Sequence, residues 1–567
     1  MVDHARGHCD WRLAPDNRAG ARALAEAIGV HPAVARVLLL RGATNADAAR
    51  TFLNPSADSM SSPFDLTDMQ KAVDRIVLAR DKNEKVMVFG DYDVDGIAGT
   101  ALMVSALKRF GIGECAFGMP NRLHEGYGLS ADRVDWAHAL GVALIVTVDN
   151  GTSAHEAIAR AESLGIDVIV TDHHLIERGL PPAFAVINPK REPAGHPAAD
   201  ICGSGVALKL AQALNGTLED LDLAALGTVA DVVPLVGENR VIVALGLRDA
   251  AKRKRVGLRA LAEISKVSLD ALRAEDIAYQ LAPRINASGR MGDGLAGLTL
   301  LLTESEDEAW EKAEELNAAN EERKLVEGET LTEALAILKE SFNDSHRAIV
   351  LANRGWHRGV IGIVASRLQA THYRPVVLVA LDDDGLGRGS ARSIHGFNIA
   401  AAFEACSAHV VQCGGHAMAA GLTIKEDAVA AFRDAFEAIA REQLPSGELR
   451  RIIDIDAQVS LTEMDTRLVR TLEQLQPFGQ GNSAPVFCAF GVHVPVNSWR
   501  ELRGGHLKFV AKEGPRLTDV IGFRMADRMG ALAGAPAVDL AFTPQLNTWR
   551  GETTVQLVLR DIRIATP

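Results

Sequence analysis

The feature that most constrains the fold is a series of short runs in which almost every residue is apolar. These runs lie at residues 86–89, 143–148, 168–170 and 183–187, and helical patterns separate them. A strand that is apolar on both faces is typical of a parallel sheet with helices packed on each side, because helical crossovers join its strands. We therefore expect the first large domain to be α/β, with a parallel sheet at its centre.

The chain has 567 residues, too many for a single hydrophobic core, and changes of pattern along it indicate several domains. Between residues 303 and 342, Glu, Lys, Ala and Leu dominate, which favours one or two long exposed helices. A second α/β pattern follows, and alternation with a period of two after residue 450 indicates a small β-barrel. The predicted division is 1–60 as an N-terminal helical cap, 61–302 as the catalytic α/β domain, 303–342 as connecting helices, 343–446 as the second α/β domain and 447–567 as the barrel.

Composition excludes some classes of protein without identifying a substrate. A formal net charge of -13 and a pI near 5.8 argue against a general basic surface that coats duplex DNA, although a local basic groove fits this total. The six cysteines include no Cys-x-x-Cys pair, so neither a zinc knuckle nor a disulfide framework is indicated. No run reaches the roughly 20 apolar residues of a membrane span, and the start lacks an apolar leader pattern. We expect a cytoplasmic enzyme.

Three alternating carboxylates follow the first apolar run. Asp91, Asp93 and Asp95 stand at the carboxyl end of the predicted strand and just before a helical pattern that begins near Ile97. Open parallel sheets bind their ligands at this end. Carboxylates so close together repel one another, and divalent cations that prefer oxygen ligands are the natural compensation. Taken alone, the motif is better explained as a solvated acidic turn.

Three further sites repeat the arrangement. Asp149 ends the second apolar run, although an Asp there also suits a helix cap. Asp172, His173 and His174 end the third run, and imidazoles with carboxylates suit manganese or magnesium better than a thiolate zinc site does. Asp231 stands in an apolar stretch, where a buried carboxylate needs a partner such as a metal. Their convergence at one sheet edge predicts a two-metal cluster, which clamps a phosphate and lowers the pKa of a bridging water, as phosphoester hydrolysis requires.

These motifs resemble the four signatures of the DHH phosphoesterase family. The matching residues are Asp-Tyr-Asp-Val-Asp-Gly at 91–96, Val-Asp-Asn-Gly at 148–151, Asp-His-His at 172–174 and Ala-Asp at 230–231. Other stretches resemble the family's single-strand-specific DNA exonucleases, at 120–128, 282–290, 356–362, 389–393, 414–421 and 476–481. The resemblance extends from about residue 60 to the end. It implies an α/β protein with a DHH domain, long connecting helices, a DHH-associated domain and a C-terminal oligonucleotide-binding (OB) fold β-barrel that includes 476–481.

The resemblance also implies the residues of the metal site. The expected ligands are Asp91, Asp93, Asp95, Asp149, His173 and Asp231. The expected catalytic residues are Asp93, Asp149, His173 and His174, of which His174 would face the scissile phosphate. Asp172 would fix the loop or orient an imidazole. The family often has a histidine just ahead of the first acidic motif, where this chain has Val88, Phe89 and Gly90, which leaves that position to a bridging aspartate.

Contacts to phosphate and DNA are expected mainly from basic side chains, since guanidinium groups bind phosphate in bidentate fashion and a hydroxyl donates to it. The expected residues are Arg122, His124, Arg290, His357, Ser390, Arg392 and His416. Surface salt bridging is the alternative explanation of these side chains. In the barrel, aromatic and basic residues are interleaved as on a strand-binding surface, although alternate positions must face the core. The residues expected there are Trp499, Arg500, Lys508, Trp549 and Arg550.

The activity implied by the resemblance is 5′-to-3′ hydrolysis of single-stranded DNA to mononucleotides, with two Mn²⁺ or Mg²⁺ ions, in DNA repair and recombination. Single-stranded DNA would be the partner, together with a single-strand-binding protein and a helicase. One alternative is a DHH phosphodiesterase for short oligoribonucleotides or cyclic dinucleotides, which would not need the barrel. The other is a non-catalytic single-strand-binding scaffold, against which the presence of the acidic ligands argues.

Overall fold

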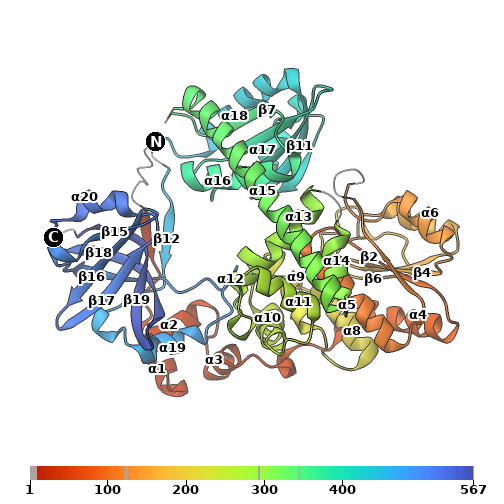
Figure 1. Ribbon diagram of the computed structural model, residues 1–567, viewed down its shortest axis with the longest axis horizontal. Coiled ribbons are helices and arrows are strands. Elements are labelled where there is room, and N and C mark those ends of the chain that lie inside the picture. The colour runs from red at the N-terminus through yellow and green to blue at the C-terminus, as the bar shows by residue number, and fades with distance from the viewer. Residues whose placement is uncertain (1–8, 122–125, 292–293, 344, 448, 566–567) are drawn as a thin grey trace. The chain divides into compact units, whose positions relative to one another are not determined.

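The computed structural model describes the chain except for residues 1–8, 122–125, 292–293, 344, 448 and 566–567 (Figure 1). Two compact units share the chain. The first, here called the catalytic unit, holds Asn17–Asn320 and Arg470–Ala484, and the second holds Met1–Asp16, Glu321–Val469 and Pro485–Pro567. In the described part of the chain no single helix has the length and apolar composition to cross a membrane, although the bent pair Arg18–Ile28 and Pro32–Leu40 meets those two criteria together.

The catalytic unit is built on a five-stranded sheet with the order β3-β2-β4-β5-β6, in which every neighbouring pair is parallel. The parallel strands predicted from the apolar runs are confirmed, and β2 and β4 are buried along their whole length. The strands are β2 (Val86–Gly90), β3 (Cys115–Gly118), β4 (Leu144–Val148), β5 (Asp167–Thr171) and β6 (Ala185–Ile187).

Helices cover both faces of this sheet (Figure 1). Because side chains alternate along a strand, Val86 and Val88 of β2 pack in the large core with α5, while Met87 and Phe89 pack in a smaller core with α6 and α7. Burial on both faces explains why the strands read as continuous apolar runs. The helices that pack on this sheet are α4 (Met69–Asp81), α5 (Val94–Phe110), α6 (Ala131–Ala139), α7 (His155–Ser163) and α8 (Gly203–Asn215).

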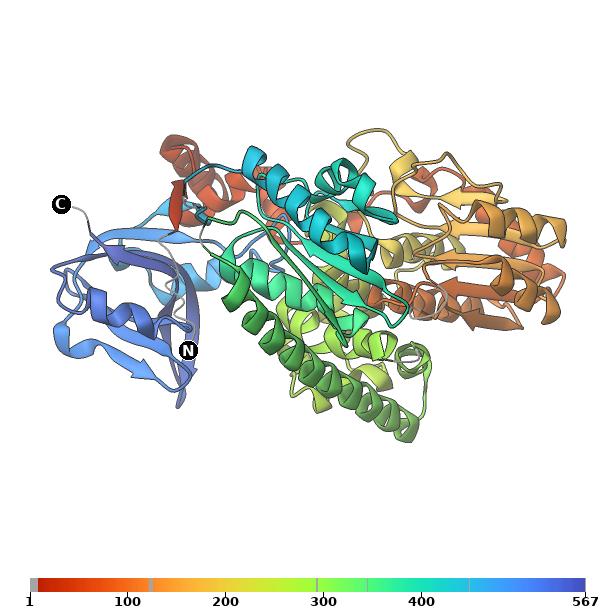
Figure 2. The ribbon, with the colours of Figure 1, turned by 90° about the horizontal axis from the view of Figure 1, so that it is seen from above.

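The rest of the catalytic unit is helical. Its N-terminal helices are α1 (Arg18–Ile28), α2 (Pro32–Leu40) and α3 (Ala46–Leu53). After the sheet come α9 (Leu221–Ala230), α10 (Gly237–Ala250), α11 (Val256–Ile264), α12 (Ala274–Asp276), α13 (Ala282–Met291) and α14 (Leu295–Leu302). The expected connecting region is one continuous helix, α15 (Glu306–Ser341), which Figure 2 shows as a long green rod.

The second unit contains the other α/β domain. Its sheet has the order β10-β11-β9-β8-β7, with β7 and β8 parallel and the other pairs antiparallel. Helix α16 packs against β7 and β8, as the predicted second α/β pattern requires. The elements are β7 (Ile349–Arg354), α16 (Arg358–His372), β8 (Val376–Leu381), β9 (Leu386–Arg392), α17 (Ile399–Ala405), β10 (Gln412–His416), β11 (Ala419–Lys425) and α18 (Val429–Gln443).

The C-terminal part of the second unit is a seven-stranded sheet with the order β13-β14-β18-β19-β17-β16-β15. This part contains β13 (Ala457–Gln458), β14 (Phe487–Val492), β15 (Arg500–Leu502), β16 (His506–Glu513), β17 (Arg516–Gly522), α20 (Met529–Leu532), β18 (Val538–Trp549) and β19 (Glu552–Ile564). Helix α19 (Thr466–Glu473) follows β13, and its residues from Arg470 onward belong to the catalytic unit. Alternating burial along β16 explains the period-two pattern of its sequence.

Two segments are placed in ways that local sequence patterns do not indicate. Strand β1 (Asp10–Leu13) pairs in parallel with β12 (Ile452–Ile455), so the first described residues belong with the second unit. Residues 470–484, which we expected within the barrel, pack with the catalytic unit. Both placements depend on contacts between residues more than 200 positions apart, and helix or strand periodicity carries no information about them.

Candidate active site

Three neighbouring strands of the parallel sheet end level with one another, and a carboxylate follows each. The last residues of β2, β4 and β5 are paired in register. Asp91, Asp149 and Asp172 are the next residues, and their exposed fractions are 2%, 2% and 1%. The parallel register therefore brings three buried carboxylates to one edge of the sheet.

The chain turns sharply after β2, so that α5 begins within a few residues. A Cβ at Gly90 would lie 1.9 Å from Oγ1 of Thr100, so only glycine permits this close approach of helix and strand. Asp93 caps α5, because its carboxylate accepts hydrogen bonds from the N–H groups of Asp95 at 3.0 Å and Gly96 at 3.2 Å. The cap fixes the turn from which the acidic side chains project.

The carboxylate of Asp95 is held by the start of a distant helix. Its two oxygens accept hydrogen bonds from the N–H groups of Gly203 at 2.7 Å and Ser204 at 3.0 Å, at the N-terminus of α8. The positive end of the helix dipole favours a negative charge there. A Cβ at Gly203 would lie 2.4 Å from Cβ of Asp149, so the glycine also leaves room for a second carboxylate.

His173 lies at the centre of the acidic group. Its Nε2 atom is 3.1 Å from Oδ1 of Asp149, 3.7 Å from Oδ2 of Asp231 and 4.0 Å from Oδ2 of Asp95. The backbone of Asp149 is left-handed, with φ of 62°, and the Tyr127 hydroxyl donates a hydrogen bond to its carbonyl at 2.7 Å. One imidazole nitrogen is therefore within 4.0 Å of three carboxylates from three different segments.

Among the described residues, three groups have side-chain atoms within 4.8 Å of one another, as ligands of one ion would be. The groups are Asp91 with Asp93 and Asp149, Asp95 with His173 and Asp231, and Asp149 with His173 and His174. Together they include all six residues predicted as ligands. Asp149 and His173 each occur in two groups, which is the arrangement expected of residues between two neighbouring cation positions.

Asp231 reaches the cluster from the end of α9. The next residue, Val232, is left-handed with φ of 61°, and it is 60% exposed. This conformation is costly for a β-branched residue and is found where the surroundings impose it, which is common at functional sites. The strained turn directs Asp231 toward His173.

Asp172 orients His174 and belongs to none of the three groups. Its carboxylate accepts hydrogen bonds from Nδ1 of His174 at 2.7 Å and from the N–H groups of His173 at 2.8 Å and Thr152 at 2.9 Å. Burial raises the pKa of Asp172, but these donors outweigh it and hold the pKa at about 2. Burial lowers the pKa of His174, but the bond to Asp172 outweighs it and raises the pKa to about 9. The His174 ring therefore carries a positive charge at neutral pH.

The other titratable groups show the cost of gathering these charges. Burial and the neighbouring carboxylates raise the pKa of Asp149 well above its ordinary range, and they raise that of Asp231 to about 8. Burial lowers the pKa of His173. In the described part of the chain, the buried atoms Oδ1 of Asp149 and Nε2 of His173 make no hydrogen bond. Divalent cations fit this donor set, since they neutralise the carboxylates and accept oxygen and imidazole ligands.

Comparison with known proteins agrees with this arrangement. Family models match the "DHH family, N-terminal domain" at residues 85–230, the "DHHA1 domain" at 345–442 and the "RecJ OB domain" at 455–561. The single-stranded-DNA-specific exonuclease RecJ of Escherichia coli is 36% identical over 558 residues, which cover 94% of this chain and 96% of that protein. The chain belongs to the RecJ family. The fold class predicted from the sequence is thereby confirmed.

Two other RecJ proteins extend the comparison. RecJ of Bacillus subtilis is 34% identical over 565 residues, covering 98% of this chain and 71% of that protein. The crystal structure of Thermus thermophilus RecJ in complex with Mn²⁺ matches with a TM-score of 0.84 and 31% identity, over 100% of this chain and 81% of that chain. The whole described architecture, including the barrel, is thus that of RecJ.

The basic residues predicted around the RecJ cluster are only partly placed. Arg122 and His124 lie outside the described residues. Arg290 is half-buried near the end of α13, and a Cβ at the preceding Gly289 would lie 3.2 Å from the carbonyl oxygen of Tyr92. The structure therefore brings the end of α13 against the acidic turn that follows β2.

Three of the four predicted residues of the RecJ DHHA1 domain lie on one face of its sheet, and the fourth caps a helix. Arg392 and His416 are both paired with Ala419, so they project from the same face. Ser390 projects from that face too, two residues from Arg392 on β9, and its hydroxyl accepts a hydrogen bond from Arg392 at 3.3 Å. His357 caps α16 through its Nδ1 atom, which accepts from the N–H group of Gly359 at 3.1 Å. Burial lowers the pKa of Arg392.

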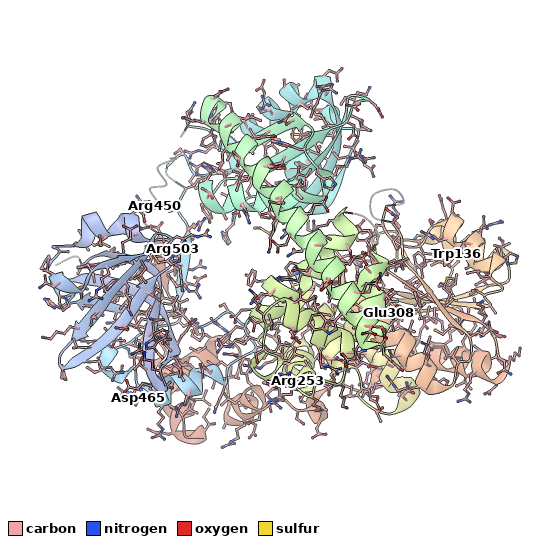
Figure 3. The ribbon with its side chains drawn as sticks, viewed as in Figure 1. Trp136, Arg253, Glu308, Arg450, Asp465 and Arg503 are labelled. Atoms are coloured by element: carbon pink, nitrogen blue, oxygen red, sulfur yellow. The ribbon has the colours of Figure 1, made fainter. Side chains whose placement is uncertain are left out.

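The predicted barrel residues differ in exposure. Trp549 is 71% exposed and Arg550 is exposed beside it, at the turn between β18 and β19. Arg500 is exposed on β15 and Lys508 forms an ion pair with Asp519 at 3.1 Å on the neighbouring strand. Trp499 is half-buried, and its ring centroid lies 4.5 Å from that of the buried Phe509. Arg503, also exposed, occupies the turn between β15 and β16 (Figure 3).

Several residues that support the site were not predicted. Besides Tyr127 and Gly203, they include two buried asparagines. Asn150 donates hydrogen bonds to the carbonyls of Phe89 in β2 and Val148 at the end of β4, and Asn188 donates to the carbonyl of His174 at 2.9 Å. Tyr127 lies in one of the stretches that resemble the exonucleases, but its contact with Asp149 is visible only in the folded chain.

Proposed function

We propose that this RecJ-family chain hydrolyses single-stranded DNA from its 5′ end and releases mononucleotides, using two Mn²⁺ or Mg²⁺ ions held at the carboxyl edge of the DHH sheet. The observation that carries the proposal is the convergence of four carboxylates, those of Asp91, Asp93, Asp95 and Asp231, on Asp149 and His173, which each belong to two possible ligand groups. The ions would be held by Asp91, Asp93, Asp95, Asp149, His173 and Asp231. When bound, they supply Lewis-acid stabilisation of the phosphoryl oxygens and a nucleophile at neutral pH.

The chain's own groups would position and neutralise the substrate. The charged imidazole of His174, 44% exposed, is a donor for a phosphoryl oxygen, because Asp172 fixes one side of its ring. The two N–H groups at the start of α8 bind the carboxylate of Asp95 and keep it directed at His173. With Asp93 and Asp149, these histidines form the proposed catalytic set.

DNA contacts are proposed for the remaining basic residues. Arg290, and Arg122 with His124, would bind phosphates near the cluster. His357, Ser390, Arg392 and His416 would do so on the DHHA1 domain. The exposed pair Trp549 and Arg550 suits stacking of a base and contact with its phosphate, and Trp499, Arg500 and Lys508 would extend that surface.

The family relationship favours this function over both alternatives. The RecJ OB model matches residues 455–561, which a phosphodiesterase for dinucleotides would not need. The complete acidic set argues against a non-catalytic scaffold. We further propose a cytoplasmic protein that acts in DNA repair and recombination, with a helicase to unwind the substrate and a single-strand-binding protein to coat it.

Release of label from oligonucleotides tests the proposal. Single-stranded and duplex DNA, labelled at either end, would be treated with the enzyme and Mn²⁺, Mg²⁺ or chelator. We expect metal-dependent loss of the 5′ label from single strands, reduced at least about 100-fold in Asp149→Asn, because losing a metal ligand should cost no less than losing a residue that only hydrogen-bonds to a ligand. Asp132→Asn, on the exposed face of α6, is the matched control. Equal digestion of duplex, or activity that persists in chelator, would contradict the proposal.

A further inference from the structure

The stretch at 470–484, here called the clip, belongs to the catalytic unit although barrel elements flank it on both sides. It begins within α19, follows β13 and precedes β14, and the RecJ OB model spans it. The chain therefore leaves the barrel, packs with the catalytic unit and returns.

Arg240 on α10 forms hydrogen bonds with the first half of the clip. Its guanidinium donates hydrogen bonds to the carbonyls of Leu475 at 2.8 Å, Gln476 at 2.8 Å and Gln474 at 3.3 Å. A fourth hydrogen bond reaches the carbonyl of Phe52 at 3.0 Å, and the centroid of the Phe52 ring lies 3.9 Å from the guanidinium carbon. The three clip carbonyls lie just beyond the end of α19, where a cation is favoured. Arg240 is 3% exposed, so each bond is protected from water.

The second half of the clip packs closely against the loop that precedes α10. The N–H group of Leu235 donates to the carbonyl of Gln480 at 2.7 Å. A Cβ at Gly479 would lie 2.7 Å from Cδ1 of the buried Leu235. Gly481 is left-handed, with φ of 71°, and a Cβ there would lie 3.1 Å from Cβ of Pro234. Both glycines of the Gln-Pro-Phe-Gly-Gln-Gly stretch are therefore required by contact with the catalytic unit.

The clip is also closed on itself. The side-chain amide of the buried Asn482 donates to the carbonyls of Leu475 at 2.9 Å and Pro477 at 2.8 Å. Arg41 donates to the carbonyl of Ser483 at 3.1 Å, which holds the end of the clip to the N-terminal helices. The segment thus has a defined shape and is held along its length, unlike a flexible linker.

We propose that Arg240 is a positioning residue that locks the clip to the catalytic unit and thereby couples DNA bound on the barrel to the nuclease site. The inference rests on the proposed function. If the lock is released, the barrel stays covalently attached, but the effective concentration of barrel-bound DNA at the site falls. In the described structure the side-chain hydrogen bonds of Arg240 run only to Phe52 and the clip, so the chemical step itself should not change.

Steady-state kinetics on a long single strand, well beyond the roughly 4–16 nucleotides that one OB fold covers, test the coupling. We compare the full-length wild type with Arg240→Met, which removes the donors, and with Gly479→Val, which clashes with Leu235 from the other side. Arg248→Met, an exposed arginine on the same helix, and Gly113→Val, where a Cβ meets nothing within 4 Å, are the controls. Hydrogen exchange of residues 470–484 reports whether the clip has opened.

We expect both clip variants to raise KM roughly tenfold or more while kcat and the half-saturating Mg²⁺ concentration stay within about twofold of the wild type. Clip amides should exchange faster, with strands β16–β19 still protected, whereas the controls should match the wild type. An unchanged KM in a variant whose clip exchanges faster would overturn the inference, as would an equal fall in kcat. A variant that unfolds is recognised by loss of protection in β16–β19. In that case Arg240→Lys, which keeps the charge but cannot bridge three carbonyls, takes the place of the unfolded variant, and the same rise in KM is expected. A wild type without metal-dependent activity would instead refute the proposed function.

Discussion

Removing the metal should make stability depend on pH in a direction that the cluster determines. In the metal-free protein, the pKa of Asp231 is raised from its ordinary value of 3.8 to about 8. Between these values the folded protein holds a proton that the unfolded chain has released, so the free energy of unfolding falls as pH rises. A bound cation replaces that proton. The stabilisation by Mg²⁺ should therefore grow from about pH 5 to about pH 8.

The magnitude follows from the size of the pKa difference. A change of the Asp231 pKa from 3.8 to about 8 lowers the free energy of unfolding of the metal-free protein by at most about 6 kcal/mol, at about 1.4 kcal/mol per pH unit. Because 26% of the Asp231 side chain is exposed, water weakens the effect, and we expect about 2–3 kcal/mol. That free energy corresponds to roughly 4–12 °C in the unfolding midpoint of a large domain.

Differential scanning fluorimetry in Mg²⁺ and in chelator, across this pH range, measures the effect. The matched variant is Asp231→Asn, which cannot ionise and should flatten the pH dependence of the metal-free protein. An increment from Mg²⁺ that is the same at both ends of the range would refute the reasoning. So would an undiminished pH dependence in Asp231→Asn.

Two further predictions concern residues outside the ligand set. Tyr127→Phe removes the hydroxyl that donates to the Asp149 carbonyl at 2.7 Å, and we expect kcat to fall about tenfold with little change in KM, as steady-state kinetics would show. A proportional rise in KM would contradict that role. The buried ion pair of Lys209 and Glu238, at 2.6 Å, makes Lys209→Met destabilising by about 3–5 kcal/mol in chemical denaturation, because Glu238 is left buried without its cation. Adding Glu238→Gln should restore part of the loss, and no recovery would argue against this cause.

The pattern of apolar residues along the strands is sufficient to predict one part of the site. Apolar runs located β2, β4 and β5, and parallel strands that end together place Asp91, Asp149 and Asp172 at one edge. The residue types there, carboxylates and imidazoles, indicated a metal site, and the resemblance to the DHH family supplied the expected ligands. Local pattern was sufficient to locate Asp91, Asp149 and Asp172, because each lies directly after a buried strand.

The remaining features depend on contacts between distant residues. The helix start that holds Asp95 lies 108 residues further along the chain, and Arg240 lies 235 residues from Leu475. In the sequence, Gly203 indicates only the start of a helix, and the need for a glycine there comes from the contact with Asp149 in the folded chain. Such requirements come from three-dimensional packing, and a single sequence does not express them as a period or a motif.

The pairing of β1 with β12 has a consequence for synthesis of the chain. Asp10 pairs with Ile452, so β1 leaves the ribosome 442 residues before its partner exists. At roughly 5–20 residues per second, it waits about 20–90 s with its edge unpaired. The two-stranded sheet of β1 and β12 can therefore form only after most of the chain has been made, and any product that stops before residue 452 retains an N-terminal strand open to pairing with another molecule.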